Sequence, residues 1–312
     1  MGNVWGLTTL VYNVLRQKMN VYLLGQWTQG PMGLTLNEIN EFESFDIKRR
    51  YGHRLDAPVH PQFKLTIEGA ENIDSIDIES DTIVQPRVKP DVDPIITPFD
   101  QLNLNCSTAN AVSLLVQWFM YQNPYATQPY SPSRLYLYYE ARLQKENDNK
   151  IHDVGVSFSD IFAVLNLASP VPDESDWIYS IHSVNNKPPN HDDDTYIPFV
   201  GVQLNPTLSN LNTCLKVNGP FIAAVTVTQE FELHAKYAYN PTDKVLGYQP
   251  LLFTNFSEAA QTFTAINSFG QYWGDRGKVT LHAADLFKDP VFTSSIYTLV
   301  PDIEDSDEEK SD

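Results

Sequence analysis

Helical patterns come before strand-like patterns along this chain, and that order constrains its fold more than any other feature of the sequence. The first helical run places Val112, Leu115 and Phe119 on one face. Helices are expected at 107–122, 133–145 and 157–167. Strands are expected at 221–228, 251–255, 262–267 and 278–281. Helices followed by strands indicate an α+β domain and argue against alternating βαβ units.

The chain divides into three zones. Residues 1–95 have no strong hydrophobic period and are expected to form an N-terminal extension. Several prolines lie between residues 86 and 98. Proline lacks an amide donor and restricts the residue before it, so this segment is expected to be an extended connector. Residues 96–300 are expected to form one domain. Residues 301–312 are so acidic that they are expected to be a disordered tail.

Charge and composition exclude several classes of protein. A net charge of −18 argues against nucleic acid as a partner, and the basic run at 48–50 is better explained by salt bridges to nearby acids. No apolar run is long enough for a transmembrane segment, and the N-terminus lacks the pattern of a secretion signal. Two cysteines, Cys106 and Cys214, make no disulfide framework. We therefore expect an intracellular, non-secreted protein.

No metal or cofactor is expected. His191 precedes three aspartates in an insertion rich in Asn, Pro and Asp, and such a cluster could bind a metal ion. However, consecutive residues seldom converge on one ion, and a solvated loop explains the composition equally well.

Six short segments carry a family resemblance through their order and spacing. They read DQ and LNCSTANA within 100–111, PSRLYLYYEAR at 132–142, DVGVS at 153–157, PDE at 172–174, LKVNGPFIA at 215–223, and NSFG and WGDRG within 267–277. This set resembles the bacterial and large-DNA-virus branch of the papain-like cysteine peptidases. The resemblance implies an α+β fold of two lobes at 96–300, with a helical left lobe and an antiparallel, β-barrel-like right lobe.

The resemblance also assigns the catalytic positions of that family to residues of this chain. In the family, a cysteine at the start of the central helix attacks the substrate, a histidine holds the proton, an asparagine orients the histidine, and a glutamine helps form the oxyanion hole. Gln101 and Asn267 stand at the glutamine and asparagine positions. Ser107 stands at the cysteine position, and Tyr248 stands at the histidine position.

These replacements imply a catalytically degenerate member, a pseudo-peptidase with no catalytic residues. A serine hydroxyl with no base is far less reactive than a thiolate. A tyrosine, with a pKa near ~10, is a poor base at neutral pH. Losing the nucleophile or the base of such a triad costs on the order of 10⁶ in turnover.

Cys106 is the fallback nucleophile. It lies one residue before the position of the family's cysteine. One residue is about 100° of rotation on a helix, so Cys106 is expected to point away from the usual site. His234 could serve as its partner only if the chain carries a large insertion before Asn267.

Three functions therefore stay open. The first is a non-catalytic structural or interaction protein, whose partners are other proteins in a large assembly such as a virion, where it would be a capsid-associated component. In that case the N-terminal extension would act as a docking arm. The second is an active cysteine peptidase that uses Cys106. The third is a peptide-binding module that keeps affinity for peptides without turnover.

Overall fold

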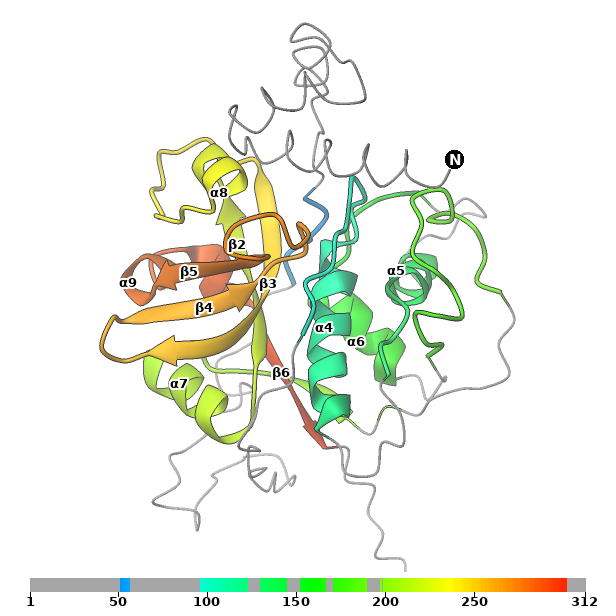
Figure 1. The fold of residues 1–312 in the computed structure, drawn as a ribbon, viewed down its shortest axis with the longest axis horizontal. Coiled ribbons are helices and arrows are strands. Elements are labelled where there is room, and N and C mark those ends of the chain that lie inside the picture. Colours follow the sequence, from blue (N-terminus) through cyan, green and yellow to red (C-terminus); the bar gives the residue numbers. More distant parts are fainter. Residues whose placement is uncertain are drawn as a thin grey trace, which may run out of the picture.

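The fold is known from a computed structural model, which describes residues 51–56, 96–122, 130–144, 152–166, 171–189, 197 and 199–301 (Figure 1). The helices are α4 (Ser107–Tyr121), α5 (Arg134–Leu143), α6 (Phe158–Asn166), α7 (Leu208–Val217), α8 (Gln229–His234), α9 (Ala283–Leu286) and α10 (Pro290–Ser294). The strands are β1 (Phe199–Gln203), β2 (Phe221–Val227), β3 (Gly247–Ser257), β4 (Thr262–Ile266), β5 (Lys278–His282) and β6 (Ile296–Pro301).

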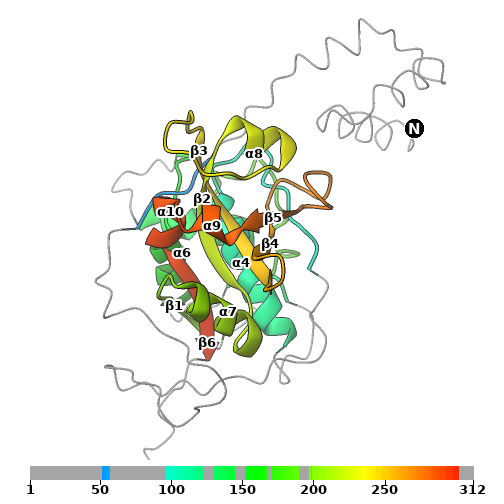
Figure 2. The ribbon, with the colours of Figure 1, turned by 90° about the vertical axis from the view of Figure 1, so that its left-hand side faces the viewer.

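The strands form one antiparallel sheet of six strands in the order β1-β6-β2-β3-β4-β5. Helix α4 packs against one face of this sheet, on β2, β3 and β6, while α5 and α6 pack against α4. Figure 2 views the molecule from the sheet side, where α7 and α9 lie. The protein therefore has a helical lobe and a sheet lobe that meet along α4 and β3.

The α+β prediction with two lobes is confirmed, with one refinement in the sheet lobe. The predicted helices and strands are all present, most of them within one or two residues of their expected ends. β1 and β6, which the sequence pattern did not reveal, extend the sheet on the far side of β2. Because β1 and β5 are both edges in the described part of the chain, the sheet is open and does not close into a barrel.

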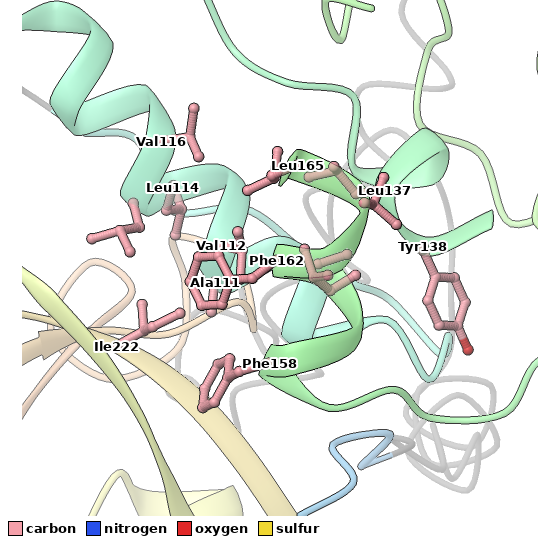
Figure 3. Close-up of a cluster of buried hydrophobic side chains, with 14 of the residues drawn as sticks. Ala111, Val112, Leu114, Val116, Leu137, Tyr138, Phe158, Phe162, Leu165 and Ile222 are labelled. Atoms are coloured by element: carbon pink, nitrogen blue, oxygen red, sulfur yellow. The ribbon is translucent and has the colours of Figure 1, made fainter. Parts of the chain in front are cut away.

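The core of the helical lobe is built around α4, which is buried on almost every side (Figure 3). Ala111 and Val112 of α4 pack with Phe162 of α6, and Ile222 of β2 joins the same cluster. Burying one such large apolar side chain contributes about 1.5–3 kcal/mol. A helix with apolar residues on several faces must be covered on several sides, so α4 is fixed between the sheet and the other two helices.

The second core lies on the opposite face of the sheet. Phe221 and Phe253 stack on neighbouring strands with ring centroids 4.9 Å apart, and Phe263 meets Phe253 edge-on at 5.9 Å. Leu211 and Cys214 of α7 are fully buried against this face. Successive side chains along each strand point to opposite faces of the sheet. Neighbouring residues of one strand therefore enter different cores.

Polar contacts set the starts of α5 and α6. Ser133 caps α5 by accepting a hydrogen bond from the amide of Tyr136 at 3.3 Å. At the start of α6, the amide of Ser157 donates to Asp160 at 2.7 Å, and Ser157 Oγ accepts from the amide of Asp160 at 3.3 Å. Both arrangements satisfy amides that a helix start leaves without partners.

Pro250 marks the part of β3 that faces the junction between the lobes. A proline within a central strand would remove a ladder hydrogen bond. At this position β3 pairs with β2 through Ala224, whereas its pairing with β4 begins only at Leu252. Before Leu252, β3 therefore pairs with β2 on one edge only. Its other edge is available to the residues that follow β4, beginning with Asn267.

Candidate functional site

The candidate site lies where the start of α4 meets the beginning of β3. Ser107 is the first residue of α4 and is completely buried. Its Oγ has no hydrogen-bond partner among the described residues. A buried hydroxyl at this place could act as a nucleophile only if a neighbouring group removed its proton.

Four polar side chains from three parts of the sequence meet at the junction of the two lobes. Gln249 Nε2 lies 2.9 Å from three acceptors, namely Gln101 Oε1, Asn267 Oδ1 and Ser268 Oγ. Ser268 Oγ also donates to Gln101 Oε1 at 2.7 Å. All four residues are buried, and we call them the amide cluster.

The amide cluster joins the two lobes. Gln101 precedes α4, whereas Gln249, Asn267 and Ser268 belong to the sheet lobe. The backbone reinforces the connection, because the amide of Gln101 donates to the carbonyl of Ser268 at 2.9 Å. Within a buried environment each of these hydrogen bonds is costly to lose, since the remaining partner cannot turn to water.

Gln249 contacts both Gln101 and Asn267 and lies between them. The sequence predicts Tyr248 at this place. Successive residues of a strand point to opposite faces, and Tyr248 packs, half-buried, against the helical core. The pattern Gly-Tyr-Gln-Pro carries no signal that fixes the alignment to within one residue, and only the pairing of β3 places Gln249 against Asn267.

Both ends of the Gln101 side chain are engaged within the junction. Its Nε2 donates to the carbonyl of Leu104 at 3.1 Å, while its Oε1 accepts from Gln249 and Ser268. The side chain therefore serves as a link between the loop before α4 and the sheet lobe.

Cys106, the fallback nucleophile, faces the helical lobe. Its Sγ lies 2.8 Å from Tyr179 Oη and 3.2 Å from Asn110 Nδ2. Burial raises the pKa of the Cys106 thiol to about 12, although the hydrogen bond to Tyr179 and the charge of Arg134 lower it. The thiol is neutral at physiological pH and is a poor nucleophile.

The surroundings of Cys106 are a polar network of the helical lobe. The guanidinium of Arg134 lies between the rings of Phe99 and Tyr179, 4.0 and 3.9 Å from their centroids. It also binds Glu174 at 2.6 Å and Asn110 at 2.9 Å. His234, proposed above as a partner for Cys106, is exposed at the end of α8 in the sheet lobe.

Residues 51–56 of the N-terminal extension cross the junction of the lobes at this site, and we call them the strap. They are drawn in blue between β3 and the start of α4 in Figure 1. Tyr51 packs edge-on against Phe269 at 6.2 Å and closely against Gly247. Gly52 packs so closely on Asn105 that an added Cβ would lie 1.9 Å from its carbonyl oxygen.

The second half of the strap is held by Val156, just before α6, and by the first turn of α6. The amide of Arg54 donates to the carbonyl of Val156 at 3.1 Å, and His53 forms a parallel β-bridge with the same residue. Asp56 accepts from the amide and the hydroxyl of Ser159 at 3.0 and 2.6 Å. No feature of the sequence singled out this segment, because its partners lie about a hundred residues away.

The described residues contain no group of three or more His, Cys, Asp or Glu side chains suited to a metal ion. The acidic insertion at His191 lies outside the described residues. Within the same described ranges, no helix is both long and apolar enough to span a membrane.

Comparison with known proteins supports the fold. No protein-family model and no curated protein matches the sequence. Among solved structures, xylellain, a cysteine protease from Xylella fastidiosa, matches with a TM-score of 0.63 and 18% identity, over 82% of this chain and 97% of that one. Procathepsin L2 from the larval midgut of Tenebrio molitor matches with a TM-score of 0.57 and 15% identity, over 94% and 93% of the two chains.

The proform of Amb a 11, a cysteine protease and ragweed pollen allergen, matches with a TM-score of 0.51 and 14% identity, over 72% of this chain and 67% of that one. Identities this low establish a shared fold and leave the chemistry to be argued from the residues themselves.

Proposed function

We propose that this chain, which has the papain-like fold, is a catalytically inactive member that acts as a structural or interaction protein. The observation that carries the proposal is the contact between Gln249 and Asn267. We infer from this contact that a neutral amide stands where a peptidase of this fold needs an imidazole. An amide neither takes a proton from a nucleophile at neutral pH nor returns one to a leaving group.

The nucleophile position supports the same proposal. Ser107 offers a hydroxyl in place of a thiol, and none of its described neighbours hydrogen-bonds to it. Serine nucleophiles need a matched base within hydrogen-bond reach. With Gln249 Nε2 within 2.9 Å of three acceptors that its two protons share, the amide cluster is arranged to hold the lobes together and is not arranged to move a proton.

An active peptidase that uses Cys106 is the second candidate. Its thiol is fully buried, has a pKa raised to about 12 and contacts a tyrosine and an asparagine. Reactive cysteines have the opposite properties, namely a lowered pKa and access to solvent. Activity through Cys106 would therefore require a rearrangement of Tyr179 and Arg134.

A peptide-binding module is the third candidate. Carbonyls and amides near the start of α6 could pair with an extended peptide. In this chain the strap already pairs there, through Arg54 and Val156. Because the strap already occupies this backbone, a structural role is favoured over the capture of a free peptide. The strap is also an intramolecular contact of the N-terminal extension, for which we propose the role of a docking arm.

The partners we propose are other proteins in a large assembly. The net charge of −18 disfavours a nucleic-acid partner. The motifs resemble the bacterial and large-DNA-virus branch of the papain-like peptidases, so a virion or capsid-associated component is the specific assembly to test. Affinity capture of the tagged chain from its native source should recover a stable multiprotein complex, whereas recovery of short peptides alone would favour the module.

Catalysis is tested with the purified full-length chain, a broad set of fluorogenic peptide substrates and a peptide epoxide that alkylates active-site thiols. We expect no turnover and no labelling. Turnover that disappears in Cys106→Ala but persists in Cys214→Ala would overturn the proposal. The double variant Ser107→Cys/Gln249→His should be labelled by the epoxide faster than the unmodified chain, because it restores a thiol at the helix start and an imidazole beside Asn267.

A further inference from the structure

We propose that Asn218 is a site of spontaneous covalent modification that the native fold suppresses. Its conversion to aspartate or isoaspartate would then mark chains that have unfolded and hinder their return to the fold. Asn218 and Gly219 form the one Asn-Gly pair in the sequence. Because glycine has no side chain to shield its amide nitrogen, such a pair closes a ring more readily than other asparagine pairs. The inference does not depend on whether the candidate site is catalytic.

The modification needs only the chain and water. The amide nitrogen of Gly219 loses its proton and attacks Cγ of Asn218, and the side-chain amide group leaves as ammonia. Water then opens the five-membered succinimide, either to aspartate with the normal backbone or to isoaspartate, in which the chain runs through the side chain. No electrons are transferred, and both products carry a carboxylate in place of a neutral amide.

In the folded chain the attacking nitrogen is engaged. The amide of Gly219 donates to the carbonyl of Cys214 at 2.9 Å, at the turn where α7 ends. Gly219 has a φ of 139°, and a Cβ added there would lie 2.5 Å from the ring of Trp118 in α4. The turn therefore has a conformation that suits glycine and is packed against α4, which restrains this nitrogen from moving toward Cγ of Asn218.

The leaving amide group of Asn218 is held as well. Its Nδ2 donates to Thr298 Oγ1 at 3.0 Å and to the carbonyl of Leu299 at 3.1 Å. Thr298 Oγ1 donates its own proton to the carbonyl of Pro220 at 2.8 Å, so toward Asn218 it acts as an acceptor. Asn218 is only 5% exposed. These contacts fix the side chain against β6 and oppose its rotation toward the nitrogen of Gly219.

The same contacts disfavour the product. A carboxylate at position 218 would face two acceptors, Thr298 Oγ1 and the carbonyl of Leu299, in a buried place. If Thr298 turned its proton to the carboxylate, the carbonyl of Pro220 would lose this donor. Isoaspartate would in addition lengthen the backbone at a closely packed turn. Because a buried charge without donors is costly, the modified chain should refold poorly.

The rate of modification is tested on the full-length chain at pH 8 and 37 °C, either native or unfolded in guanidinium chloride, by peptide mapping with mass spectrometry. In denaturant, Asn218 should be modified faster than any other asparagine. In the native chain its rate should be lower by at least about a hundredfold, because only the open fraction reacts. Asn186, exposed in the segment between α6 and β1, is the internal control, and its rate should differ by less than about tenfold.

Equal rates at Asn218 in the native and the unfolded chain would overturn the proposal. A rate in denaturant no higher than that of the other asparagines would overturn it as well.

The effect on refolding is tested with Asn218→Asp, which carries the carboxylate of the product. Urea denaturation at pH 7 should show the ratio of folded to unfolded chain lowered by roughly a hundredfold relative to the unmodified chain. Asn186→Asp adds the same charge at an exposed position and should change this ratio by less than about threefold. Equal ratios in the two variants would contradict the proposal.

A second measurement needs no variant and applies even if Asn218→Asp does not fold. The unmodified chain is aged in denaturant until about half of Asn218 is converted, transferred to native buffer and treated briefly with a protease. The resistant, refolded fraction should retain the amide at position 218, whereas the digested fraction should be enriched in the carboxylate. The same proportion of carboxylate in both fractions would show that the modification does not hinder folding.

Discussion

Gln249 Nε2 lies 2.9 Å from Asn267 Oδ1 in the buried junction between the two lobes. The same nitrogen contacts Gln101 Oε1 and Ser268 Oγ at the same distance, so a single side chain links the loop before α4 to the end of β4. These contacts are buried and join the two lobes, so the link stabilises the relative position of the lobes, while Gln249 Oε1 and Asn267 Nδ2 have no hydrogen-bond partner among the described residues.

Replacing Gln249 by alanine should therefore destabilise the whole domain. The change leaves acceptors of Gln101 and Asn267 buried without this donor, which predicts a loss of roughly 2–4 kcal/mol in the free energy of unfolding. Urea denaturation followed by tryptophan fluorescence measures it. Gln271→Ala, at an exposed position, is the control and should shift the free energy by less than about 0.5 kcal/mol. Equal effects of the two substitutions would show that the amide cluster contributes little.

Cys106 should react extremely slowly with thiol reagents in the folded chain. Burial raises its pKa to about 12, so the thiolate is rare at neutral pH and its fraction grows about tenfold per pH unit up to that value. The rate of labelling in the Cys214→Ala variant, which leaves Cys106 as the only thiol, measures this reactivity. Full labelling in denaturant serves as the control. Rapid labelling of the native chain at pH 7 would contradict the buried placement of the thiol.

Arg134 should contribute strongly to the stability of the helical lobe. Its guanidinium binds Glu174 at 2.6 Å and lies between two aromatic rings, and its side chain is only 9% exposed. Arg134→Met keeps much of the apolar stem but leaves the carboxylate of Glu174 without its cation, which predicts a loss of about 3 kcal/mol in thermal or urea unfolding.

Lys216→Met is the matched control for Arg134→Met. It breaks the exposed pair of Lys216 with Glu258, whose side chains are 60% and 61% accessible, and it should not change the midpoint of unfolding measurably. A similar loss of stability in both variants would mean that the buried ion pair of Arg134 stabilises the protein no more than the exposed pair of Lys216.

Gly155→Ala should unseat the strap at every pH. The added Cβ would meet the backbone of Gly52 at 1.6 Å, and backbone cannot move aside as a flexible side chain can. Hydrogen exchange should show residues 51–56 unprotected at pH 8 as well as at pH 5. Leu55→Ala changes an exposed side chain of the strap itself and should leave its protection unchanged. Normal protection in Gly155→Ala would show that the strap is not held at this contact.

The sequence alone determined the class of fold and suggested several residues of the candidate site. Periodic apolar residues defined α4, α5 and α6, because such a pattern along a helix can be read without coordinates. The resemblance of short motifs to the papain-like peptidases implied that Gln101 and Asn267 belong to one site although they are far apart in the chain. They also showed that a serine stands at the start of α4.

The tertiary structure decided which side chain meets Asn267 and what crosses the junction of the lobes. A shift of one residue in β3 exchanges Tyr248 for Gln249, and only the pairing of β3 with β2 and β4 fixes that register. The seat of His53 depends on contacts with Thr108 and Val156, which are 55 and about 100 residues away. Such contacts leave no periodic trace in the sequence, because they arise only when separate elements pack together.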